Sequence, residues 1–177
     1  MGRKRASGGA ARVALVGVLS ALSLVVLYLA ALAPTGRLGL VAAAGLVPAA
    51  AVVSAGLPAG LFCYGATGLL GLFLSPDKGQ AALYLLFFGL YPLVKCLFER
   101  LRRRWLEWIY KLAFFNLVFA LLWLTLRPVL LSGLPTMFES LWVFCLIGNG
   151  TFIVYDLGFS RLIALYAARI DKHIRHS

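Results

Sequence analysis

The sequence has few charged residues and no recognisable catalytic motif. Only 13% of its 177 residues are charged, and six of them are acidic. Carboxylates paired for acid–base catalysis would have to come from separate segments, because these six are scattered along the chain. The P-loop, the HExxH and GxSxG motifs and the dinucleotide-binding fingerprint are all missing, so we expect no enzyme activity. The acidic residues are Asp77, Glu99, Glu107, Glu139, Asp156 and Asp171.

Cysteine and histidine are also scarce. Cys63, Cys96 and Cys145 stand alone in apolar surroundings, without CxxC or Cys/His spacing. This argues against a zinc site and against a disulfide framework. His173 and His176 lie in the polar C-terminal tail, where solvation explains them better than metal binding. We therefore predict no metal site and no cofactor.

Hydrophobic residues, in contrast, make up 62% of the chain. Soluble domains are about half apolar and about a quarter charged, so this composition is typical of an integral membrane protein. The formal net charge of +11 gathers at the ends of apolar runs. No groove-reading motif accompanies it, and we expect no nucleic-acid partner. The expected partner is the lipid bilayer.

Six apolar runs predict an all-α bundle of six transmembrane helices. One membrane domain is expected over residues 12–169, between a basic N-terminus (1–11) and a polar tail (170–177). The second run is short and contains Pro48 with several small residues, which favours close packing inside the bundle. Alternatively, the second and third runs form a re-entrant pair. The predicted spans cover residues 12–33, 38–54, 57–74, 80–98, 105–126 and 138–156, after a loop at 132–135, and the last helix continues to about residue 169.

The first run has a rival interpretation as a signal peptide. It has a basic start, and an "ALA" sequence at residues 31–33 resembles a cleavage site. However, its apolar stretch of about 20 residues is the length of a membrane span. We therefore expect an uncleaved first helix.

Basic residues are distributed unevenly between the two ends of the predicted spans. Six spans place fourteen of them on the side that holds both termini and three on the other side. Cytoplasmic loops carry an excess of Lys and Arg, so both termini are predicted to be cytoplasmic in a multi-pass protein of the cell membrane. The fourteen are Arg3, Lys4, Arg5, Arg12, Lys95, Arg100, Arg102, Arg103, Arg104, Lys111, Arg161, Arg169, Lys172 and Arg175, and the three are Arg37, Lys78 and Arg127.

Polar residues inside predicted spans are costly in lipid and are functional candidates. Asn116 and Asn149 fall near mid-depth of the fifth and sixth spans, where they either bond across helices or contact a ligand. Lys95 and Asp156 fall near the inner ends of the fourth and sixth spans. We predict an ion pair between them, with snorkelling of Lys95 to the headgroups as the alternative.

Aromatic residues gather toward the predicted outer side. They form either an interfacial belt or a stacking pocket for a flat ligand, with nearby charged residues as polar contacts. From depth and polarity, the candidate substrate-binding residues are Asn116, Asn149, Trp123, Trp142, Tyr84, Glu139 and Arg37.

The first span carries small residues at helical spacing, namely Ala10, Ala14, Gly17 and Ala21. Such a stripe serves either packing within the bundle or docking of a partner membrane protein. Its sequence, "ARVALVGVLSALSLVVLYLA", resembles the opening helix of the substrate-binding S components of energy-coupling factor (ECF) transporters. The chain length, the six spans and the cytoplasmic termini are similar to that family too.

The resemblance implies an uptake function for a vitamin-like small molecule. It also implies docking of the stripe on a transmembrane T component, which works with two separate ATPases. No ligand residue is transferred from the family. The alternative is a non-enzymatic scaffold similar to the rod-shape-determining membrane protein D.

Overall fold

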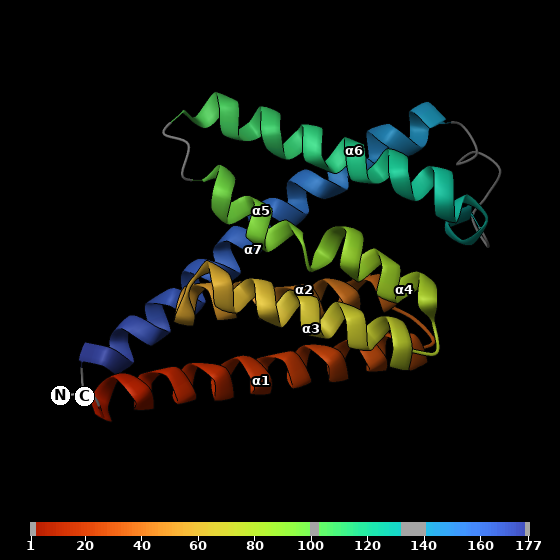
Figure 1. Ribbon diagram of the computed structural model, residues 1–177. Helices are drawn as coiled ribbons and strands as arrows, with labels where there is room; N and C mark the ends of the chain where they lie inside the picture. Colours follow the sequence, from red (N-terminus) through yellow and green to blue (C-terminus); the bar gives the residue numbers. More distant parts are fainter. Residues whose placement is uncertain (1–2, 100–102, 132–140, 176–177) are drawn as a thin grey trace. The chain divides into compact units, whose positions relative to one another are not determined.

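The computed structural model describes residues 3–99, 103–131 and 141–175, which are almost entirely helical (Figure 1). No strand occurs in these ranges, so the all-α prediction is confirmed for them. In chain order the elements are α1 (Arg3–Leu32), α2 (Arg37–Ala55), α3 (Leu57–Leu74), α4 (Lys78–Leu83), the π-helix η1 (Tyr84–Phe88), α5 (Tyr91–Phe98), α6 (Arg104–Leu131) and α7 (Leu141–Arg175).

Six helical segments within the described residues are long and apolar enough to cross a membrane. The 19 residues of α2 and the 18 of α3 each span about 27–29 Å, which favours two separate spans over a re-entrant pair. The predicted continuation of the last helix beyond residue 156 is confirmed by the unbroken α7, whereas residues 132–140 lie outside the described residues. The six segments are Gly9–Leu32, Arg37–Ala55, Leu57–Leu74, Lys78–Phe98, Trp105–Leu124 and Cys145–Ala168.

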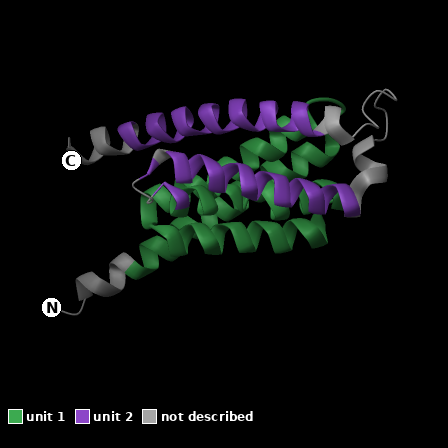
Figure 2. Cartoon of the chain, turned by 90° about the horizontal axis from the view of Figure 1, so that it is seen from above, with its two compact units in different colours: residues 1–97 green, residues 98–177 purple. Residues whose placement is uncertain are grey.

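The chain divides into two compact units (Figure 2). Unit 1 comprises residues 1–97 and unit 2 residues 98–177. The single membrane domain expected over residues 12–169 stays a prediction, and so does the placement of both termini.

Unit 1 is built on α1, α2 and α3, which pack against one another pairwise (Figure 1). The predicted close packing of α2 is confirmed, because its buried face consists mainly of small residues around Pro48. Gly45 shows why they are small: a Cβ atom there would collide with the backbone carbonyl of Phe88 in η1. The helix backbones can therefore approach closely. The core cluster is Leu27, Ala30, Val41, Ala44 and Tyr84.

Hydrogen bonds from side chains to backbone carbonyls connect the helices of unit 1. Ser23 Oγ on α1 donates to the Ala44 carbonyl of α2 at 2.9 Å. Thr67 Oγ1 on α3 donates to the Ser20 carbonyl at 3.2 Å. Ser23 and Thr67 are fully buried, so these bonds satisfy hydroxyl groups that have no access to solvent.

The fourth candidate span is interrupted just before Pro92. The α-helix widens into the π-helix η1, whose end is marked by the i→i+5 bond from Gly89 N–H to the Tyr84 carbonyl at 2.8 Å. Helix α5 then restarts at Tyr91, so Pro92 is its second residue. Proline lacks an N–H group, and its ring clashes with the carbonyl four residues earlier, here that of Phe88. The break therefore precedes the proline.

Unit 2 contains the antiparallel helices α6 and α7. The rings of Phe115 and Phe152 stack with centroids 4.6 Å apart. One turn further along α6, Phe119 lies against Gly148, where an added Cβ would be 3.3 Å from its ring. From the first contact to the second, the α6 residue changes from 115 to 119 and the α7 residue from 152 to 148, as expected for antiparallel helices. Side chains on one stripe of each helix therefore form this interface.

Candidate functional site

The small-residue stripe of α1 is exposed. Ala10, Ala14, Gly17 and Ala21 are all exposed, and an added Cβ at Gly17 would meet no heavy atom within 4 Å. A different face of α1 packs into unit 1, with Ser20, Ser23, Leu27 and Ala30 buried. Packing within unit 1 therefore leaves the stripe unused, which keeps it open to another molecule.

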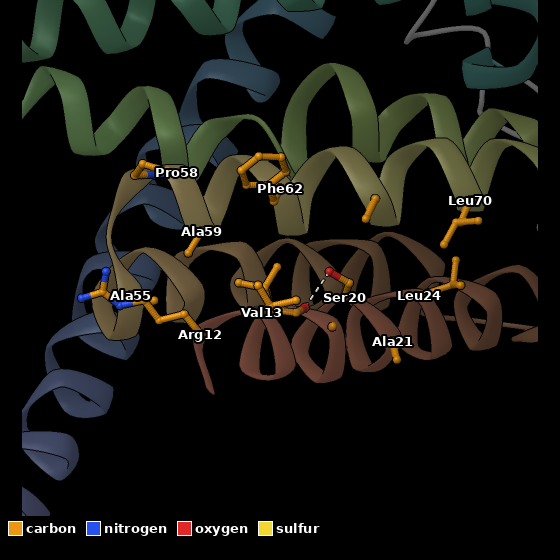
Figure 3. A pocket seen from close by; sticks show the side chains of 13 residues that line it. Arg12, Val13, Ser20, Ala21, Leu24, Ala55, Pro58, Ala59, Phe62 and Leu70 are labelled. Carbon is orange, nitrogen blue, oxygen red and sulfur yellow. Dashed lines mark hydrogen bonds between the residues drawn. The ribbon is translucent and has the colours of Figure 1, made fainter. Parts of the chain in front are cut away.

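Part of this stripe borders an apolar groove between α1 and α3 (Figure 3). The groove has a volume of about 780 Å³. Gly17 and Ala21 line it on the α1 side, and Ala59 and Phe62 line it on the α3 side. Its charged residue is Arg12, which lies in the same region as Ala55 at the end of α2. The sequence places Arg12 among the inner-side cations but does not predict the groove, because composition does not determine the rotation of a helix about its axis.

Asn116 of α6 and Asn149 of α7 form a reciprocal amide pair. Asn116 Nδ2 donates to Asn149 Oδ1 at 3.0 Å, and Asn149 Nδ2 donates to Asn116 Oδ1 at 3.2 Å. The second N–H of each amide reaches a carbonyl of its own helix, that of Leu112 or Cys145, at 2.8 Å. Of the two alternatives, the bond across helices is present, and the contact with a ligand stays a prediction. Because every amide N–H is engaged, the pair retains only acceptor capacity for a ligand.

The other candidate substrate-binding residues are dispersed. Tyr84 is fully buried in the core of unit 1, with its hydroxyl 3.4 Å from Ser23 Oγ. Arg37 is exposed and lies 3.8 Å from an Asp77 carboxylate oxygen. In unit 2, Trp123 is half-buried. Glu139 and the side chain of Trp142 lie outside the described residues. A common pocket for all seven candidates stays a prediction, since they are divided between the units.

A buried ionic cluster surrounds Lys111 of α6. Its Nζ lies 2.6 Å from Glu107 Oε1, 3.2 Å from Asp156 Oδ2 and 3.5 Å from Glu99 Oε1. The side chains of Lys111 and Asp156 are both 3% exposed, whereas that of Glu99 is 47% exposed. Burial of an ion is costly unless it is paired, so the Lys111–Asp156 contact offsets two burial penalties at once.

The predicted Lys95–Asp156 pair concerns residues of different units and stays a prediction. Asp156 has Lys111 as a partner within its own unit. Lys95 is 2% exposed, and its Nζ lies 5.9 Å from the centre of the Tyr91 ring. The snorkelling alternative, in which the amine of Lys95 reaches the headgroups, also stays a prediction. The sequence analysis did not predict the Lys111 cluster, although Glu107 and Lys111 lie one helical turn apart, which is the spacing of an ion pair on a helix.

Comparison of the chain with protein-family models, with curated proteins and with solved structures found no match. The inference of function therefore depends on the chain's own residues. The features that bear on it are the exposed stripe of α1, the groove beside it and the amide pair of unit 2.

Proposed function

We propose that the chain is the membrane-embedded, substrate-binding subunit of an ECF-type uptake transporter for a vitamin-like small molecule. The proposed location is the cell membrane, with both termini in the cytoplasm. The observation that carries this proposal is the exposed stripe of Ala10, Ala14, Gly17 and Ala21. Small residues let the backbone of a second transmembrane helix approach closely, and the helices of unit 1 leave this face unused.

In this proposal, separate proteins hydrolyse the ATP that drives uptake. The sequence has no P-loop, so a subunit of this type depends on ATPases that associate through a T component. The stripe of α1 is the proposed contact with that T component. Non-enzymatic binding and release of the substrate would then be this chain's own contribution.

The amide pair limits which hydrogen-bonding groups a substrate can present to it. If Asn116 and Asn149 line the substrate site, their remaining lone pairs can only accept hydrogen bonds. A substrate that contacts the intact pair must therefore carry N–H or O–H donors. Trp123 is the candidate for stacking on a flat ring, and Arg37 for an anionic group.

Co-purification from membranes of the native host tests the proposal. The full chain, tagged at one terminus, is expected to recover one T component and two ATPases identified by mass spectrometry. The Ala14→Leu variant places a bulky side chain on the stripe and should reduce this recovery at least tenfold. Ala113→Leu, at an exposed position on α6, is the matched control and should not. Recovery of cell-wall synthesis proteins alone would overturn the proposal and favour the scaffold similar to rod-shape-determining membrane protein D.

A further inference from the structure

The groove between α1 and α3 combines apolar walls with a cation. Its lining includes one charged residue, Arg12, and one hydroxyl, Ser20. The Ser20 hydroxyl donates to the Val16 carbonyl of its own helix at 2.8 Å and is therefore engaged. Arg12 is exposed and forms no ion pair with any residue that the structure describes. Its guanidinium is thus the group in the groove that remains available for an anion.

The dimensions of the groove match one leaflet of a bilayer. Along α1 its lining runs from Arg12 to Leu24, which corresponds to about 18 Å of helix. Half of a hydrocarbon core is about 15 Å thick. Arg12 lies toward the end of α1 that carries Arg3, Lys4 and Arg5, the end predicted to face the cytoplasm. The cation therefore lies at headgroup depth, and the apolar part extends toward the middle of the membrane.

We propose that this groove binds one anionic phospholipid of the inner leaflet. Its phosphate would pair with the Arg12 guanidinium, which matches phosphate geometry with two parallel N–H groups. One acyl chain would lie along Val13, Gly17, Ala21 and Leu24 of α1, with Phe62 and Ala66 on the α3 side. This binding is separate from substrate uptake. Gly17 and Ala21 also belong to the stripe, so a lipid in the groove and the proposed T component would compete for these two residues.

A transmembrane helix fits the groove less well than a lipid chain. A helix would leave Arg12 facing an apolar surface, whereas an anionic headgroup compensates its charge. The charge of Arg12 therefore favours the lipid.

Native mass spectrometry of the purified full chain in detergent tests whether Arg12 gives the groove a preference for an anionic headgroup. Phosphatidylglycerol and phosphatidylcholine with the same acyl chains are titrated separately. Phosphatidylglycerol should bind about fivefold more tightly, as expected for one additional cation–anion contact near the membrane surface. Arg12→Gln should remove this preference. Arg161→Gln removes an exposed inner-side cation outside the groove and should retain it. Equal loss in both variants would indicate diffuse attraction and overturn the proposal.

A second pair of variants tests the groove itself. Ala66→Leu fills part of it and should weaken binding of both lipids at least fivefold, because the acyl chain loses its space. Ala120→Leu, exposed on α6, is the control and should have no effect. Circular dichroism establishes that each variant remains helical. Unchanged affinity in Ala66→Leu would contradict a lipid in the groove.

Photocrosslinking in intact membranes identifies the occupant. Phe62 is 73% exposed and lines the groove, so a benzophenone amino acid at this position should be tolerated. The expected adduct has the mass of a phospholipid. An adduct with a protein would assign the groove to a partner helix and overturn the lipid proposal. These results do not depend on Ala14→Leu, because Ala14 lies outside the groove lining.

Discussion

The two units hold their helices together in different ways. In unit 1, helices approach closely through small residues, and buried hydroxyls of Ser23 and Thr67 donate to backbone carbonyls. In unit 2, large rings separate α6 from α7, and the polar contacts join side chains to side chains. A backbone carbonyl is present whatever the sequence, whereas a side-chain partner can be deleted. Single polar substitutions should therefore damage unit 2 more than unit 1.

The largest effect is expected from Lys111→Met in unit 2. This change leaves Asp156 buried without its 3.2 Å partner and also removes the 2.6 Å contact with Glu107. Breaking a buried ion pair from one side costs about 3–5 kcal/mol of unfolding free energy. Denaturant unfolding in detergent micelles, followed by tryptophan fluorescence, measures the loss. Lys78→Met is the control, because among the described residues this exposed lysine of unit 1 donates to the Leu72 and Phe73 carbonyls alone. Its loss should cost less than about 1 kcal/mol of unfolding free energy.

A double-mutant cycle determines how specific this ionic contact is. Lys111→Met and Asp156→Asn should be coupled by about 0.5–3 kcal/mol, since the two residues share one contact. Additive effects would contradict the cluster as described. The same cycle with Lys95→Met tests the ion pair that the sequence predicts between Lys95 and Asp156. Coupling in both cycles would mean that Asp156 is shared by two lysines.

For unit 1, the sharpest test replaces a glycine instead of a polar residue. Gly45→Ala places a methyl group against the Phe88 carbonyl, and the backbone there cannot yield as a flexible side chain would. Overpacking of this kind costs about 1–3 kcal/mol. Gly39→Ala on the same helix is the matched control, because no heavy atom lies within 4 Å of its added Cβ. The control should gain up to about 1 kcal/mol from helix propensity. Equal effects of the two changes in unfolding experiments would refute close packing at Gly45.

The sequence predicts what depends on hydropathy and misses what depends on helix rotation. Five candidate spans agree with the predicted ones to within about three residues at the ends that the structure describes, because long apolar runs and the breaks at Pro34 and Pro76 are local signals. The depth of Asn116 and Asn149 indicated that each amide needs a partner, but not that the two residues bond to each other. The partner of Asp156 within unit 2 did not follow, because Lys95 and Lys111 occur at similar depth. Only the relative rotation of α6 and α7 shows that Lys111 reaches Asp156.

The break in the fourth span shows a second limit. Pro92 is visible in the sequence, but the π-helix four to eight residues before it is a tertiary consequence. Tyr64 of α3 donates to the Leu85 carbonyl inside η1 at 2.8 Å, and Gly89 leaves room for the Tyr84 ring. The hydrogen bond joins residues 21 positions apart in sequence, and no local pattern specifies it.

The smallest loss of unfolding free energy is expected at the amide pair. The same experiment separates the two roles proposed for Asn116, which are the bond between α6 and α7 and contact with the substrate. Asn116→Leu leaves Asn149 without its partner on α6, and hydrogen bonds between membrane helices contribute about 0.6 kcal/mol on average and at most about 1.7 kcal/mol. Asn116→Leu combined with Asn149→Leu should recover part of this loss, because no amide then remains unpaired. Thr151→Val is the control, since this exposed hydroxyl donates only to the Ile147 carbonyl of its own helix. Unchanged unfolding free energy in Asn116→Leu, together with lost substrate binding, would assign the amide pair to the ligand instead of to the interface of α6 and α7.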